Sequence, residues 1–166
     1  MKSKYQNGEQ FYHKLYISFN GFIAVTLLPM GWLLLEKQTD QLVPLPIDAF
    51  YTWLIITSIF LATSALIYSS LTKFKKATRQ AAENKRLRIK LDAYRRASTT
   101  KYFEFLLVGI LYFVGMWLTG NTLFLVGYIV SLILLSLGRP TISAFIEDLK
   151  LSAEEETILL EKKPIE

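Results

Sequence analysis

The chain has 166 residues, a formal net charge of +5 and no cysteine, which excludes disulfides, iron–sulfur clusters and thiol chemistry. Hydrophobic residues make up 52% of it and lie in long blocks, a pattern typical of a membrane protein and not of a soluble domain. Because the length corresponds to about one domain, we expect residues 1–166 to form a single membrane domain.

Two uncharged runs in the first half of the chain are predicted to span a membrane. Residues 15–35 and 50–71 contain 21 and 22 consecutive positions without a charge. A helix rises 1.5 Å per residue, so each run can cross a hydrocarbon core about 30 Å thick. The first run is too long for a typical signal core and no small-residue cleavage site follows it, so we expect it to be retained.

Two shorter apolar runs follow, at residues 103–118 and 122–138, and a turn is predicted between them at 119–121 because Gly120 and Asn121 favour tight turns. The sequence therefore predicts an all-α integral membrane protein with four transmembrane helices in two hairpins. The alternative is that the third and fourth runs form a re-entrant segment.

A strongly basic segment connects the second and third runs. Residues 71–101 hold eleven of the nineteen lysines and arginines, against only Glu83 and Asp92. Positive charge is retained on the cytoplasmic side of short loops, so we expect this segment and both termini to be cytoplasmic, in a plasma membrane. No Gly or Pro interrupts it, so the second helix is predicted to continue to about Tyr94 and to break at residues 98–100. Leu87, Leu91 and Tyr94 share one face that would be buried.

The basic segment is not expected to bind nucleic acid, since its cations point in nearly every direction around a helix and few aromatic residues lie between them. The simplest interpretation is a solvated helix whose charge sets topology. The alternative is contact with anionic lipid headgroups or an acidic partner. The residues placed best for that contact are Lys73, Lys75, Lys76, Arg79, Arg95, Arg96 and Lys101.

The C-terminal segment, residues 139–166, is predicted to form a short helical cytoplasmic tail. Pro140 suits a first helical turn, and the spacing of Ile142, Phe145, Ile146 and Leu149 indicates an amphipathic helix that lies on the membrane or packs on the protein itself. Ser152 and Glu155 match a capping box that opens a second helix. From residue 147 onward seven acidic residues face three basic ones, so we expect the tail to contact the basic extension of the second helix.

The predicted spans carry packing residues and no catalytic motif. No charge lies in the interior of any span, and we expect no catalytic residue, no metal and no cofactor. Asn20 is the most polar residue inside a span. Small residues at helical spacing predict a face for helix packing or docking, because they let helix backbones approach closely. They are Ser58, Ala62, Ala65 and Ser69 in the second run, and Gly127 and Ser131 in the fourth.

These features predict a non-catalytic protein that acts as an accessory or scaffold subunit of a larger membrane assembly, with membrane lipids and other membrane subunits or further copies of itself as partners. The alternative function is a self-assembling pore or channel, although no charged ring or filter-like loop supports ion selectivity. An intramembrane enzyme is a third and weaker alternative.

Overall fold

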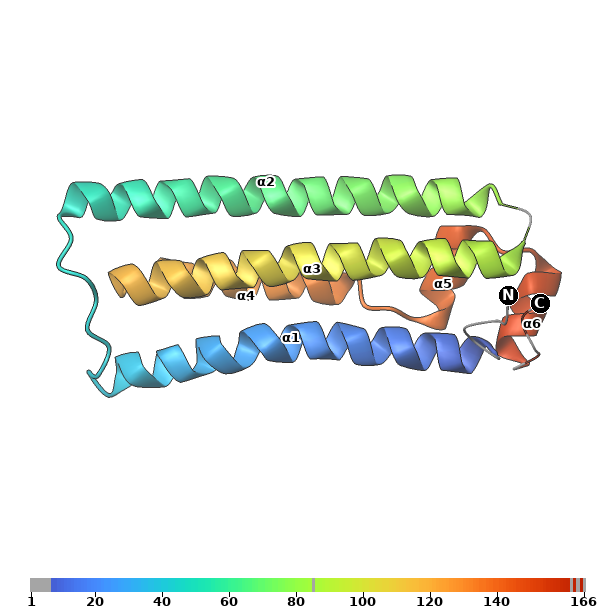
Figure 1. Cartoon of the computed structure of the whole chain (residues 1–166), viewed down its shortest axis with the longest axis horizontal. Helices are drawn as coiled ribbons and strands as arrows, with labels where there is room; N and C mark the ends of the chain where they lie inside the picture. Colours follow the sequence, from blue (N-terminus) through green and yellow to red (C-terminus); the bar gives the residue numbers. More distant parts are fainter. Residues whose placement is uncertain (1–6, 85, 162, 164, 166) are drawn as a thin grey trace. The chain divides into compact units, whose positions relative to one another are not determined.

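The computed structural model describes residues 7–84, 86–161, 163 and 165, and these residues form an all-helical protein (Figure 1). The described helices are α1 (Gly8–Gln38), α2 (Ala49–Ala82), α3 (Leu87–Thr119), α4 (Leu123–Leu137), α5 (Ile142–Leu149) and α6 (Ala153–Leu160). The predicted all-α class is therefore confirmed.

Three of these helices, α1, α2 and α3, are long and apolar enough to cross a membrane. Helix α4 has only 15 residues and would be about 22 Å long, which is short for a hydrocarbon core of about 30 Å. Together with α5, which is bent by 75° from it, α4 gives a fourth candidate. The part of the chain that the structure describes therefore has three to four candidate membrane-spanning helices.

The break between α2 and α3 falls earlier than the sequence predicted. Helix α2 ends at Ala82, and α3 begins at Leu87 and continues through residues 98–100, so the expected continuation to Tyr94 is wrong. Asn84 donates from its side-chain amide to the carbonyl oxygens of Gln80 and Ala81. Such local bonds compete with helix continuation, so an asparagine ends this helix where no Gly or Pro is present.

The described chain divides into two compact units. Unit 1 comprises residues 1–20, 71–101 and 139–166, and unit 2 comprises residues 21–70 and 102–138. Helices α1, α2 and α3 each contribute residues to both units.

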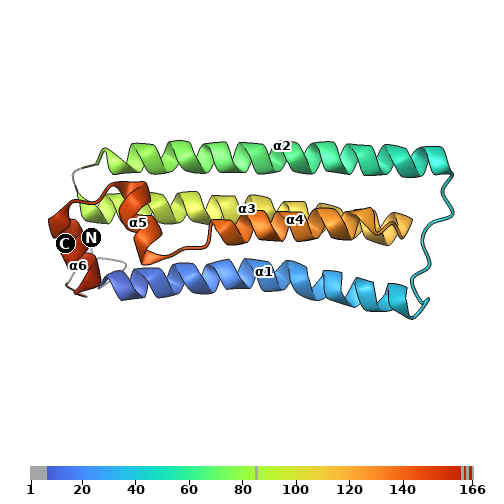
Figure 2. The same ribbon diagram turned by 180° about the vertical axis from the view of Figure 1, so that it is seen from behind.

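Unit 2 holds an apolar core contributed by α1 to α4. Its buried residues are Met30, Leu33, Ile56, Val108, Tyr112, Met116, Phe124 and Tyr128. Helix α4 lies beside α3, as the view from behind also shows (Figure 2), and the ring of Phe124 occupies the space that a side chain at Gly115 would need. The predicted turn between these helices is present, with Gly120 at φ +64°, a conformation that glycine adopts without strain.

Unit 1 is closed by the C-terminal tail. Phe145 of α5 and Leu149 are fully buried, and the ring of Phe145 lies 5.4 Å from that of Phe11 and 5.0 Å from that of Tyr94. Leu159 of α6 packs so closely on Gly8 of α1 that a Cβ there would lie 2.7 Å from its Cδ2 atom. Of the two alternatives for this tail, packing on the protein itself is the one observed.

The start of α5 also differs from expectation. The helix begins at Ile142, with Thr141 as its N-cap, so Pro140 precedes the helix instead of lying in its first turn. The Thr141 hydroxyl accepts a hydrogen bond from the backbone N–H of Ala144, which satisfies one of the unpaired donors at a helix start. The capping box predicted for α6 is confirmed.

Candidate functional site

The small-residue stripe of α2 lies mainly on the outside of unit 2. Ser58, Ala62 and Ala65 are exposed and Ser69 is half-buried. The same helix buries Ile56 and Thr63 on its other side, which is the side that the remaining helices of unit 2 cover. The chain therefore leaves the small residues of α2 available to a neighbour, and their role as a docking face stays a prediction.

The small residues of α4 are placed differently, inside unit 2. A Cβ at Gly127 would lie 2.6 Å from Cε1 of Tyr112 and 3.1 Å from Cζ of Phe60, so glycine makes room for the two rings. Ser131 is buried and its hydroxyl donates to the carbonyl oxygen of Tyr128 at 2.7 Å. These two residues take part in the protein's own packing.

Two hydrogen bonds between tyrosine and threonine join the helices of unit 2. The hydroxyls of Thr63 and Tyr112 lie 2.9 Å apart and link α2 to α3. Tyr128 Oη donates to Thr26 Oγ1 at 3.1 Å and links α4 to α1. None of these four residues was predicted from sequence, although tyrosine and threonine inside long apolar runs are a visible signal. Asn20, the polar residue that was selected from sequence, is exposed and donates to the carbonyl oxygen of Tyr16.

The predicted cationic residues fall into two groups. Five of them are exposed, namely Lys73, Lys75, Lys76, Arg79 and Arg96, and Arg95 is half-buried. Lys101 is 5% exposed, and its ammonium lies over the ring of Phe74, 4.0 Å from the centroid. This arrangement is a cation–π contact inside unit 1, so burial separates Lys101 from the surface cations with which the sequence grouped it.

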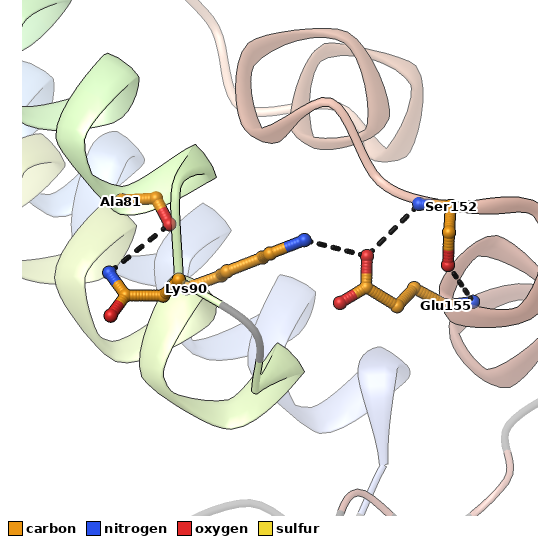
Figure 3. Close-up of polar contacts among 5 residues, drawn as sticks. Ala81, Lys90, Ser152 and Glu155 are labelled. Atoms are coloured by element: carbon orange, nitrogen blue, oxygen red, sulfur yellow. Dashed lines mark hydrogen bonds and ion pairs between the residues drawn. The ribbon is translucent and has the colours of Figure 1, made fainter.

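A nearly buried ion pair holds α6 in unit 1. The ammonium of Lys90, in α3, lies 2.7 Å from a carboxylate oxygen of Glu155, and the two side chains are 7% and 14% exposed. The same oxygen accepts a hydrogen bond from the backbone N–H of Ser152, whose hydroxyl in turn accepts from the N–H of Glu155 (Figure 3). Glu155 thus completes the cap of α6 and neutralises a buried cation with one carboxylate.

This ion pair is a contact between the acidic tail and the basic segment, as the charge pattern predicted. It differs from the prediction in its partner, because Lys90 belongs to the first turns of α3 and not to an extension of the second helix.

A second polar cluster surrounds Asp148 of α5. Tyr94 Oη donates to its carboxylate at 3.2 Å. Burial raises the pKa of Asp148, while the bond from Tyr94 and the charge of Lys101 oppose that rise. Burial also lowers the pKa of Lys101 to about 8, against the attraction of Asp148. The cluster therefore holds α5 through the charges of Asp148 and Lys101. Burial of each charge is unfavourable, and their mutual attraction offsets part of that cost.

The described residues contain no group of three or more His, Asp or Glu side chains placed to hold a metal ion. The contacts of the tail join it to α1 and α3: the ring of Phe145 packs on Phe11 and Tyr94, and Asp148 and Glu155 bond to side chains of α3. No protein-family model, curated protein or solved structure matches this chain.

Proposed function

We propose that this protein is a non-catalytic accessory or scaffold subunit of a larger membrane assembly, and that it docks a helix of another membrane protein on the α2 face formed by Ser58, Ala62 and Ala65. The support for this proposal is the exposure of those three residues. Small side chains let two helix backbones approach closely, and such faces drive helix association in lipid, where apolar surface alone gives no driving force.

A matched pair of serine substitutions tests the docking face. Ser58 and Ser64 are both exposed on α2, and at 100° per residue they point about 120° apart. We expect Ser58→Leu to reduce recovery of the partner when the full chain is purified from membranes in a mild detergent, because added bulk separates the two helices. Ser64→Leu should leave recovery unchanged. Equal recovery with both variants would contradict the proposal.

The mass of the purified particle distinguishes the two kinds of partner. A heteromeric particle that contains another membrane chain is the result we expect for an accessory subunit. A particle that contains only copies of this chain would contradict the accessory role and favour the pore-forming alternative.

We further propose four spans in two hairpins within a plasma membrane, with both termini and the basic segment in the cytoplasm. The support is the concentration of lysine and arginine in residues 71–101. Gln80 is exposed and the chain contains no cysteine, so Gln80→Cys provides a single label site. An impermeant thiol reagent should label it only after the membrane is opened, and labelling in intact cells would contradict this orientation.

A further inference from the structure

We propose that exposed cations a few residues beyond the apolar runs of α2 and α4 bind the phosphate groups of anionic lipids at the membrane surface. They are Lys75, Lys76 and Arg79 on α2, and Arg139 after α4. This inference concerns a different surface from the small-residue face at which we propose that a partner docks, so each stands or fails without the other.

The cations of α2 lie on the exposed side of the helix, and the opposite side packs against other residues of unit 1. Thr78 and Ala81 are buried, and the ring of Phe74 packs on that of Tyr94 at 5.6 Å. At 100° per residue, Lys75, Lys76 and Arg79 fall within an arc of about 100° on the other side. No acidic residue occurs between Leu71 and Ala82, so this exposed arc is uniformly positive.

The depth of these residues fits the phosphate layer of a bilayer. Lys75 and Lys76 follow the last apolar residue of the run, Leu71, by four and five positions, so they lie about 6–8 Å beyond it along the helix. The polar headgroup region on each side of a bilayer is about 5–8 Å thick. The backbone at these two lysines is therefore within the headgroup region when the apolar run fills the hydrocarbon core, and lipid phosphates are within reach of the two side chains.

Arg139 is held in place by an aromatic residue of α1. Its guanidinium lies 5.1 Å from the ring centroid of Tyr16 and donates a hydrogen bond to Tyr16 Oη at 3.1 Å. Arg139 is exposed and comes two residues after the end of α4. A planar guanidinium can bind two phosphate oxygens at once, and the contact with Tyr16 limits the side-chain freedom that such binding would remove.

Lys101 provides an internal comparison. It lies even closer in sequence to the third apolar run than Lys75 lies to the second, yet it is buried over Phe74. Its replacement should therefore change the stability of the fold and leave the affinity for lipid unchanged. Replacement of Lys75 and Lys76 should weaken lipid binding and leave the stability of the fold unchanged.

Lipid binding to the purified full chain tests the proposal. In a nonionic detergent at about 0.1 M salt, dioleoylphosphatidylglycerol or dioleoylphosphatidylcholine is titrated and bound lipid is counted by native mass spectrometry. We expect Lys75→Gln/Lys76→Gln to weaken phosphatidylglycerol binding roughly 30-fold, because each cation near a membrane surface contributes about a factor of five. The control Arg86→Gln/Lys150→Gln removes the same charge from exposed positions that are farther in sequence from the apolar runs, and it should bind as the unchanged protein does.

Three lipid-binding results would overturn the proposal. They are equal binding of the two lipids, equal weakening by both double variants, and equally tight binding of free glycerol phosphate, which would indicate a small-anion site. The proposal would also be overturned if the Lys75→Gln/Lys76→Gln variant lost a co-purifying acidic protein but still bound lipid. The variant Ser58→Leu should keep full lipid affinity, so failure of the docking proposal is distinguishable from failure of this one.

Discussion

Unit 1 and unit 2 bury their polar side chains in different ways. The polar residues described as buried in unit 2 are Thr26, Thr63, Ser70 and Ser131, all of which carry a neutral hydroxyl. Those of unit 1 include the charged residues Lys90 and Lys101.

The difference follows from what each environment allows. A helix in a hydrocarbon core can satisfy a hydroxyl with its own carbonyl groups and one neighbouring hydroxyl, as Thr63 does with Ile59, Phe60 and Tyr112. A buried ammonium needs a carboxylate or an aromatic face beside it, and unit 1 supplies Glu155 for one lysine and Phe74 for the other. Stability should therefore depend on charge in unit 1 and on close packing in unit 2.

The largest effect should come from breaking the buried ion pair. Glu155→Gln leaves the ammonium of Lys90 buried without its counter-charge, and removal of one partner of such a pair costs about 3–5 kcal/mol. We expect a large loss in the free energy of unfolding of unit 1, measured by denaturant titration or by proteolysis of the tail. Glu154→Gln is the matched control, because Glu154 is exposed in the same helical turn. Similar losses in both variants would contradict a specific role for Glu155.

The next largest effect should be a gain in stability. Burial lowers the pKa of Lys101 from 10.5 to about 8, so the unfolded chain binds more protons than the folded one between these pH values. Stability should therefore rise as the pH is raised from about 8 to 10.5. Lys101→Met should abolish this rise and stabilise the protein at pH 7 by about 2 kcal/mol, since 1 pKa unit corresponds to about 1.4 kcal/mol and the lost contacts with Phe74 and Asp148 offset part of the gain.

Thermal melting at several pH values measures both parts of this prediction. Lys76→Met is the control, because Lys76 is exposed and its replacement should leave the pH dependence unchanged. If Lys101→Met melts with the same pH dependence as the unchanged chain, the burial of this lysine does not control stability.

Packing in unit 2 is tested by adding a methyl group. At Gly127 a Cβ meets the ring of Tyr112 at 2.6 Å, so Gly127→Ala should destabilise the protein by about 1–3 kcal/mol. At Gly31 no heavy atom lies within 4 Å of the added atom, and Gly31→Ala should stabilise α1 slightly because alanine favours helix. Opposite shifts of the melting temperature in detergent are expected, and shifts of the same sign would contradict this packing.

The smallest effect should come from the hydrogen bonds within unit 2. Thr63→Val removes the bond to Tyr112, and interhelical bonds of this kind in membrane proteins contribute about 0.6 kcal/mol on average. Thr57→Val is the matched control, because the exposed Thr57, among the described residues, bonds only along its own helix, to the carbonyl oxygen of Trp53. A loss in Thr57→Val as large as that in Thr63→Val would show that the effect is local to α2.

The helical class, the turn at Gly120 and the capping box of α6 could all be predicted from sequence, because each depends on a local pattern. The break after Ala82 could not, since nothing in the chain except Asn84 interrupts the helical pattern there. That one shift places Lys90, the partner of the acidic tail, in α3 instead of in an extension of the second helix.

The burial of Lys101 could not be predicted from the sequence either. A lysine at the end of an apolar run has the same local pattern whether it faces lipid phosphates or a ring, and only the position of Phe74 on another helix decides between them. The small residues of α2 and α4 have the same helical spacing in the sequence. Those of α2 are mostly exposed and those of α4 are buried, because the neighbouring helices cover only the second set.

The most direct test of the accessory role is cross-linking from the α2 face in native membranes. Ala62→Cys places a single thiol within the proposed docking face, and Ser64→Cys places one on the same helix at an exposed position outside it. A short thiol-reactive photocross-linker on Ala62→Cys should join this 19.1-kDa chain to a different membrane protein, while Ser64→Cys yields little adduct. Adducts of equal yield from both positions, or no protein adduct from Ala62→Cys, would contradict the docking face and the accessory role with it.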